Sequence, residues 1–141
     1  MTEETKRVGG ECIGLEVRML SRLISGIYDD AMAGVGLKVS QFTVLVAVAN
    51  REGARPSALA KALAMDESTL SRNVERMCAR GWLRLEPDED RRGHWIKVTG
   101  KGMALIRKAY PAWQSAQAKV KSSLGADGVA ALESALRKLR A

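Results

Sequence analysis

Apolar residues recur at helical spacing along most of the chain, and strand-like alternation is confined to one short stretch. The pattern predicts a mainly α-helical fold with a small β-hairpin, in the order ααααββαα. Helices are expected over residues 11–34, 41–51 and 56–64, between Asp66 and Gly81, from Thr99 to Leu124, and after Gly125; strands are expected over 82–86 and 94–99. At most the first nine residues are predicted to be flexible.

The predicted first helix carries two adjacent apolar stripes. One contains Ile13, Val17, Leu20, Ile24, Ile27 and Ala31, and the other contains Cys12, Leu15, Met19 and Leu23. The last predicted helix presents a further apolar face made of Val129, Leu132, Leu136 and Leu139. A small domain offers too little surface to cover all of them, and a soluble monomer would rarely expose them. We therefore expect both chain ends to pack against a second copy of the chain.

Single residues mark where the predicted helices begin and bend. Ser40, Asp66 and Thr99 each precede a helical stretch, and their side-chain oxygens are suited to cap it. Pro111 lies inside a long helical stretch and is expected to kink it.

The stretch from Ser57 to Thr99 reads SALAKALAMDESTLSRNVERMCARGWLRLEPDEDRRGHWIKVT. It predicts a short helix, a tight turn, a second helix and a hairpin with a charged tip. A small core between the two helices is expected from Leu59, Leu63, Leu70, Val74 and Met77. This order is that of a helix-turn-helix followed by a wing, which places its second helix in the DNA major groove.

The exposed side of that second helix and the hairpin tip supply most of the candidate DNA-binding residues. The full set is Ser57, Ser68, Thr69, Ser71, Arg72, Asn73, Arg76, Asp90, Arg91 and Arg92. Hydroxyl and amide groups can bond to base edges or phosphates, and arginine can bind guanine through two hydrogen bonds. Arg91 and Arg92 can reach a minor groove or flanking phosphates. Such residues are also common on ordinary surface helices, but the order of helix, turn and wing favours DNA binding.

The acidic residues at the hairpin tip require an explanation, because Asp88, Glu89 and Asp90 would repel phosphate. We expect Asp90 to pair with an arginine and to set its direction.

The composition is that of one soluble globular domain. The 141 residues carry a net charge of +7, with 46% hydrophobic and 28% charged residues. A basic chain suits a polyanionic partner. However, residues 51–102 hold 11 basic and 8 acidic groups, whereas residues 103–141 hold 7 and 2, so much of the excess lies outside the predicted helix-turn-helix. The sequence predicts no signal peptide and no membrane span, which favours a cytoplasmic location.

Residues suited to catalysis or metal binding are few. Cys12, Cys78 and the single histidine, His94, predict neither a zinc site nor a disulfide framework. The sequence contains no recognisable nucleophile–base pair or glycine-rich phosphate loop, so we expect neither an enzyme nor a cofactor. A winged-helix adaptor that binds protein stays an alternative, although it would not need the polar helix face and the wing arginines.

Two segments resemble the MarR (multiple antibiotic resistance regulator) family of bacterial transcription factors. They are SALAKALAMDESTLSRNVERMCARGWL and EPDEDRRGHWIKVTGKG, in which the DRR tip and the V-T-x-x-G pattern are the more specific parts. The resemblance extends from the first helix through VSQFTVL to YPAWQSAQ. It implies a single winged-helix domain, with the DNA-binding part over residues 37–102 and dimerisation helices over residues 10–36 and 103–141.

The resemblance also implies how such a protein works. Members form homodimers and bind pseudo-palindromic operators, usually to repress, and many release DNA when a small molecule or an oxidant acts near the helix junction. Tyr28 and Trp113 are our candidates for lining a ligand pocket. Many members carry a further arginine in the wing where this chain has Glu89, so the wing would depend more on Arg91 and Arg92.

One subgroup of the family senses organic hydroperoxides through a reactive cysteine, and Cys12 with Tyr28 resembles that arrangement. Cys12 lies about two residues too early, a shift that turns it to another helix face. Arg18 and Val39 stand where the other tyrosines would be. Redox sensing by Cys12 therefore stays an alternative to a small apolar packing role, and Cys78 is expected in the core.

Overall fold

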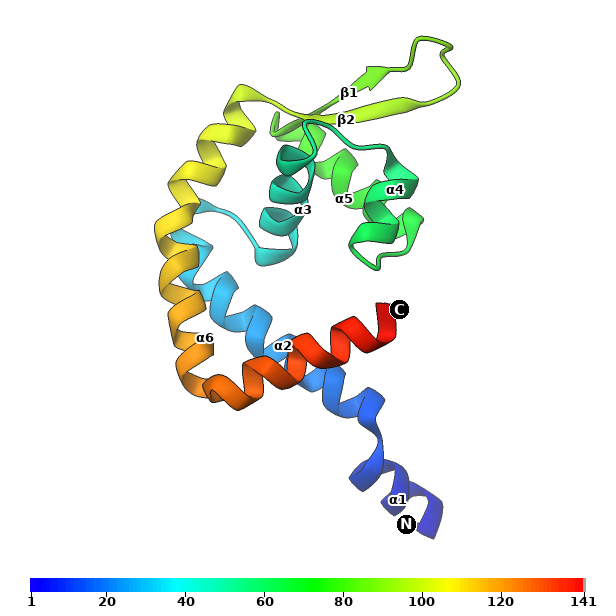
Figure 1. Ribbon diagram of the computed structural model, residues 1–141, viewed down its shortest axis with the longest axis vertical. Helices are drawn as coiled ribbons and strands as arrows, with labels where there is room; N and C mark the ends of the chain where they lie inside the picture. The colour runs from blue at the N-terminus through cyan, green and yellow to red at the C-terminus, as the bar shows by residue number, and fades with distance from the viewer. Residues whose placement is uncertain (141) are drawn as a thin grey trace.

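A computed structural model describes residues 1–140 as a helical body with an antiparallel hairpin at one end (Figure 1). The helices are α1 (Glu3–Glu11), α2 (Ile13–Met32), α3 (Val39–Asn50), α4 (Pro56–Ala62), α5 (Glu67–Ala79) and α6 (Gly100–Arg140), with a short 3₁₀ helix at Ala33–Val35. The strands are β1 (Leu83–Pro87) and β2 (His94–Val98). The mainly α-helical winged-helix fold predicted from the apolar spacing is confirmed.

The core is centred on α3. Phe42, Leu45 and Val48 of this helix are each at most 5% exposed, and α3 packs against α2, α6 and β2. The predicted core between α4 and α5 is also present. Leu59, Leu70, Val74 and Met77 are buried, and Leu63 is half-buried beside them. Each such side chain contributes about 1.5–3 kcal/mol when it leaves water, so α5 is held firmly through one face.

Thr99 joins the hairpin to α6, and it caps α6 as predicted. Its hydroxyl accepts from the Gly102 N–H at 3.0 Å and donates to the Gly81 carbonyl at 2.5 Å, while its own N–H donates to the Trp82 carbonyl at 3.1 Å. Gly102 is buried, and a Cβ built on it would lie 2.2 Å from the Trp82 carbonyl oxygen. The V-T-x-x-G pattern is therefore the packing junction between the hairpin and α6.

The first nine residues, to which the sequence confined any flexible segment, are helical from Glu3. Thr2 caps α1 by accepting from the Thr5 N–H at 3.3 Å, and Glu3 and Glu4 lie in the first turn, where negative charge favours a helix. The helix predicted from residue 11 is interrupted at Cys12, which adopts an extended conformation and separates α1 from α2.

The start of α3 also differs from the prediction, because Lys38 rather than Ser40 is the N-cap residue. The Val39 N–H donates to Asp29 Oδ1 at 2.8 Å, and the Lys38 N–H donates to Gln41 Oε1 at 3.0 Å. The Asp29 carboxylate comes from α2 and takes the role expected of the Ser40 hydroxyl.

The long helix leaves helical geometry at Gly125, after which the sequence predicted a separate helix, and not at Pro111, where a kink was expected (Figure 1). The helix runs on through Pro111, whereas Gly125 has φ 72° and ψ 170°. A positive φ costs glycine little, so this residue permits the turn. The expectation of a separate helical segment after Gly125 is confirmed, and its Arg140 side chain donates to the Ala62 carbonyl at the end of α4.

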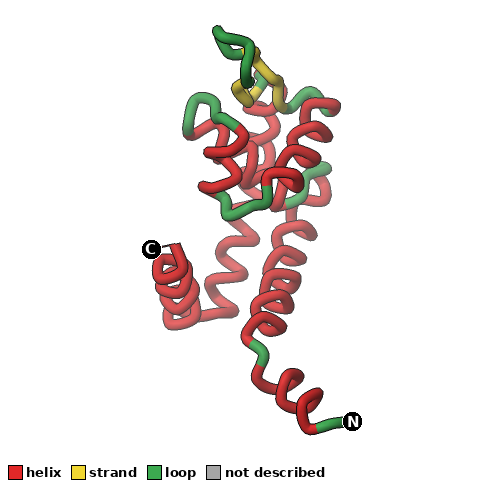
Figure 2. The backbone as a smooth tube through the Cα atoms, turned by 90° about the vertical axis from the view of Figure 1, so that its right-hand side faces the viewer, coloured by secondary structure: helices red, strands yellow, loops and turns green. Residues whose placement is uncertain are grey.

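Much apolar surface at the two chain ends is exposed. Figure 2 shows that α1, at the N-terminus, and the last part of α6, at the C-terminus, extend from the body. The exposed residues are Ile13, Leu15, Val17, Met19 and Leu23 near the start of α2, and Leu132, Leu136 and Leu139 on α6. Part of the predicted α2 seam has a partner within the chain, because Leu20, Ile24 and Ile27 are half-buried and α2 packs on α6.

Over residues 1–140, no single helix is long and apolar enough to cross a membrane. Ile13–Val35 together with Val39–Asn50 reach that length and composition, but these segments are bent by 80°.

Replacement of Gly102 by alanine is expected to destabilise the protein, because the new methyl group would collide with the Trp82 carbonyl. Overpacking of this kind costs about 1–3 kcal/mol. Gly100→Ala is the matched control, since a Cβ at Gly100 has nothing within 4 Å and lies in the same helical turn. Urea denaturation of both variants measures the effect, and a Gly102→Ala protein as stable as Gly100→Ala would contradict the account.

Candidate nucleic-acid interface

The interface predicted from the sequence is built around the N-terminal half of α5. Asp66 caps this helix, accepting from the Thr69 N–H at 3.2 Å and from the Ser68 hydroxyl. Both hydrogen bonds favour the ionised carboxylate, so the Ser68 hydroxyl and then the Thr69 N–H lower the pKa of Asp66. The cap fixes where α5 begins, and the buried Leu70 fixes how it is turned.

The remaining faces of α5 carry the polar residues expected to contact DNA. Ser68, Thr69, Ser71, Arg72 and Arg76 are exposed, and Asn73 is half-buried. Ser57, in the first turn of α4, is also exposed. The exposed and buried faces of α5 therefore separate as the sequence predicted.

Three of these residues are engaged within the protein. The Ser68 and Thr69 hydroxyls donate to Asp66, and the Arg72 guanidinium donates to Thr69 Oγ1 at 3.4 Å. Arg72 thus lies along the helix toward its N-terminus. Arg76 keeps its donors free of intramolecular partners among the described residues, so it is the more available arginine of α5.

The hairpin is held in register along its whole length, from Leu83 opposite Val98 to Pro87 opposite His94. The loop between the strands closes through a hydrogen bond from the Asp88 N–H to the Gly93 carbonyl at 2.9 Å. At its tip, Arg91 has φ 56°, and both Arg91 and Arg92 are exposed. The wing therefore presents two arginine side chains to solvent from a closed loop.

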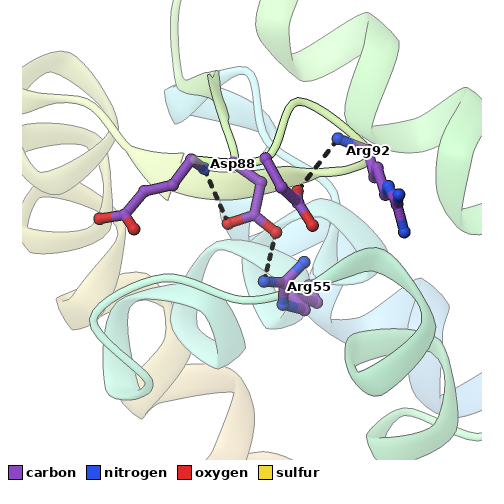
Figure 3. A network of polar contacts seen from close by, with 5 residues as sticks. Arg55, Asp88 and Arg92 are labelled. Atoms are coloured by element: carbon purple, nitrogen blue, oxygen red, sulfur yellow. Dashed lines mark hydrogen bonds and ion pairs between the residues drawn. The ribbon is translucent and has the colours of Figure 1, made fainter.

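The acidic residues of the wing are arranged differently from the prediction. Asp90 Oδ1 accepts from the Arg92 backbone N–H at 3.1 Å, and across residues 1–140 Asp90 forms no ion pair. The aspartate that pairs with an arginine is Asp88, whose Oδ2 lies 2.5 Å from Arg55 Nη2 (Figure 3). The expectation that Asp90 directs an arginine side chain is wrong, because Asp90 serves the backbone of the turn.

Arg55 is the residue that sequence reasoning missed. It lies 33 residues before Asp88, and no local pattern connects the two positions. Its guanidinium hydrogen bond is the largest cause of the lowered pKa of Asp88. The one signal in the sequence that could have indicated such a residue was the negative charge of the wing, because a carboxylate beside a phosphate-binding surface is favoured when a cation pairs with it.

The two candidate ligand-pocket residues do not line one cavity. Trp113 lines a groove of about 510 Å³ between α3 and α6, where it stacks on Tyr110 with ring centroids 5.8 Å apart. Phe42 and Arg51 lie on the opposite wall. Tyr28 is not among the lining residues; its hydroxyl donates to Gln117 Oε1, and burial raises its pKa.

The two cysteines occupy different surroundings. Cys78 is half-buried against the core as expected, and burial raises the pKa of its thiol. Cys12 is half-buried at the junction of α1 and α2. Tyr28 lies 16 positions further along, about 24 Å at 1.5 Å per residue, so one chain does not bring Cys12 and Tyr28 together.

A helix-turn-helix followed by a hairpin, with arginines at the tip, defines a winged-helix protein of the DNA-binding kind. Comparisons with known proteins agree. The sequence model of the MarR family matches residues 35–93, which run from the end of the 3₁₀ helix to the hairpin loop. The multiple antibiotic resistance protein MarR of Escherichia coli strain K12 is 27% identical over 129 residues, which cover 90% of each chain.

Two further similarities extend over nearly the whole chain. NicR, a transcriptional repressor of Pseudomonas putida, is 29% identical over 130 residues, covering 92% of this chain and 82% of NicR. A crystal structure of an Escherichia coli MarR mutant complexed with operator DNA superposes with a TM-score of 0.82 at 24% identity, covering 94% of this chain and 96% of that one. The chain is thus similar to MarR-family transcriptional regulators, through the family model over residues 35–93 and through these relatives over nearly its whole length.

Loss of the Asp66 carboxylate is expected to destabilise α5. Asp66→Ala should lower the melting temperature at pH 7, because the cap acceptor is lost, and Asp66→Asn should retain most of the stability. Since folding lowers the Asp66 pKa, the extra stabilisation by the ionised form is present above the unfolded pKa of about 3.9 and is lost as the pH falls through the folded pKa.

Thermal melts of both variants and the parent protein between pH 7 and pH 2.5 test this. The melting temperatures of the parent and Asp66→Asn should converge at the acid end. A gap that stays constant across the range would contradict the assigned role of the carboxylate.

Proposed function

We propose that this protein is a transcriptional repressor that binds a pseudo-palindromic operator as a homodimer. The observation that carries the proposal is the division of α5 into a buried apolar face and an exposed polar face that begins at a fixed cap. In this proposal Arg72 and Arg76 read base edges in the major groove, and Ser68, Thr69, Ser71 and Asn73 contact bases or phosphates. The Ser57 hydroxyl contacts the DNA backbone, and Arg91 and Arg92 bind the minor groove or the phosphates beside the major groove.

The surface area of one chain supports a dimer. The described chain exposes 9901 Å², whereas a compact monomer of its 15.3 kDa would expose about 7,100 Å². The excess is roughly 2,800 Å², somewhat above the 1,000–2,500 Å² that each partner buries in an obligate dimer. The exposed leucines and methionine on residues 13–23 and 132–139 supply an apolar surface for that interface. A two-fold dimer would place two α5 helices about one DNA turn apart.

We also propose that a small molecule acts through the groove between α3 and α6. The groove combines a stacked aromatic wall, Tyr110 and Trp113, with the charged Arg51. Because α3 packs against both α6 and β2, a molecule bound there would contact the helix that supports the wing. Such a ligand would release DNA if its binding in the groove disfavours the spacing between the two α5 helices of the dimer that the operator requires.

Arginine replacements should distinguish base reading from phosphate binding. Arg72→Ala is expected to cost about 1–3 kcal/mol on a high-affinity duplex and to relax specificity at one position. Arg91→Ala should weaken binding to specific and scrambled duplexes alike and reduce the slope of log K against log salt by about 0.9. Binding titrations over a salt series measure both, with Arg107→Ala on the exposed side of α6 as the control. Equal losses on both duplexes for Arg72→Ala would exclude its base-reading role.

Charge placed on the α2 surface should separate the dimer. Met19 and Leu23 are at least half exposed in one chain, and the proposed interface would cover them. The double variant Met19→Glu with Leu23→Glu would therefore bury two unpaired carboxylates in the dimer, which is unfavourable. Sedimentation velocity should give a dimer for the parent protein and a monomer for the variant. Leu85→Glu, an exposed leucine on β1, is the matched control and should stay dimeric. A parent protein that sediments as a monomer would refute the dimer.

A further inference from the structure

The backbone next to Arg55 is hydrogen-bonded to the wing. The residue before it, Ala54, exchanges two hydrogen bonds with Ile96 of β2: its N–H donates to the Ile96 carbonyl at 2.9 Å, and the Ile96 N–H donates back at 2.8 Å. Both residues are at most 3% exposed. Arg55 also precedes Pro56, the first residue of α4. It therefore connects the first helix of the helix-turn-helix to the second strand of the wing.

The Arg55 side chain makes two contacts that require a planar guanidinium. Its central carbon lies 4.4 Å from the centroid of the Trp95 ring, and its Nη2 lies 2.5 Å from Asp88 Oδ2. The second carboxylate oxygen of Asp88 accepts from the Glu89 N–H at 3.2 Å. Lysine could pair with Asp88 or lie over Trp95, but it lacks the flat fork that does both.

Both ends of the wing loop meet Arg55. Asp88 opens the loop and bears the ion pair, and Gly93 closes it, bonded to Asp88 through the backbone. A Cβ built on Gly93 would lie 3.4 Å from Arg55 Nη1, so the guanidinium already occupies the space beside that glycine. The Asp88 side chain is 18% exposed and the Arg55 side chain 43%, so solvent still screens part of the pair.

Arg55 also changes the charge that the wing presents. The loop holds three carboxylates, Asp88, Glu89 and Asp90, against the two arginines at its tip. Arg55 neutralises Asp88, and Asp90 accepts from the loop backbone (Figure 3). Without Arg55, the unpaired Asp88 would stand next to the surface expected to approach phosphates.

We propose that Arg55 is a positioning residue: stacked on Trp95 and paired with Asp88, it holds the wing loop so that Arg91 and Arg92 are presented to DNA. This inference rests on the proposed DNA-binding function. Arg55 acts through the loop and does not itself contact DNA.

The first test uses the free protein. Backbone ¹⁵N relaxation should show that residues 88–93 are ordered in the parent and gain motion on the nanosecond timescale in Arg55→Ala. Arg55→Lys should also loosen the loop, since its ammonium cannot stack and pair together. Arg80→Ala is the matched control, because Arg80 lies over Trp82 at 5.3 Å from the ring centroid and is not part of the wing. Unchanged relaxation in both Arg55 variants would overturn the proposal.

The second test asks whether Arg55 works through the wing arginines. In the parent background Arg55→Ala should weaken binding to a high-affinity duplex about tenfold. A factor of ten in affinity corresponds to the loss of both the stacking contact and the ion pair of an exposed arginine. In a background that already carries Arg91→Ala and Arg92→Ala, the same replacement should change affinity less than about twofold, because positioning then has no effect. A full tenfold loss in that background would mean that Arg55 binds DNA directly, and would overturn the proposal.

The two tests separate this inference from the proposed function. A parent protein without any sequence preference for DNA would refute the proposed function, whatever the Arg55 variants do. The relaxation measurement in free protein would then still decide whether Arg55 holds the loop.

Discussion

The contact of Gly102 with the Trp82 carbonyl fixes the helix-turn-helix and the hairpin to the long helix α6. Trp82 lies between α5 and β1, and Thr99 lies between β2 and α6, which it caps. A side chain at position 102 would separate these elements, because the carbonyl lies where a Cβ would stand. Since α6 also packs on α2, any displacement at this junction moves α5 and the wing relative to the chain ends that form the proposed dimer surface.

Around this junction, a few polar contacts set the geometry of the interface. Asp66 fixes the start of α5, and Arg55 with Asp88 fixes the loop of the wing. Both carboxylates have a lowered pKa because hydrogen bonds favour their ionised forms. The basic excess of the chain lies mostly in residues 103–141, so charge alone gives little reason for specific recognition by α5. In the proposed function, recognition instead depends on where a small number of arginines and hydroxyls are held.

Features that depend on nearby residues could be predicted from the sequence. The apolar spacing located α2 to α5 and the hairpin within a few residues, and the caps at Asp66 and Thr99 follow from residue type and position. Features that depend on distant residues could not. Asp29 caps α3 from another helix, and Arg55 reaches Asp88 across 33 residues, so the local signals at Ser40 and Asp90 were misleading.

The central claim is that two α5 helices held by one dimer read a symmetric site. Selection from a random DNA pool tests this claim most directly. The purified protein is incubated with the pool over a salt series, and the retained duplexes are sequenced. The account predicts enrichment of an imperfect palindrome whose half-sites are centred about one helical turn apart, about 10 base pairs. Retention without an enriched sequence, or enrichment of a single unpaired half-site, would contradict it.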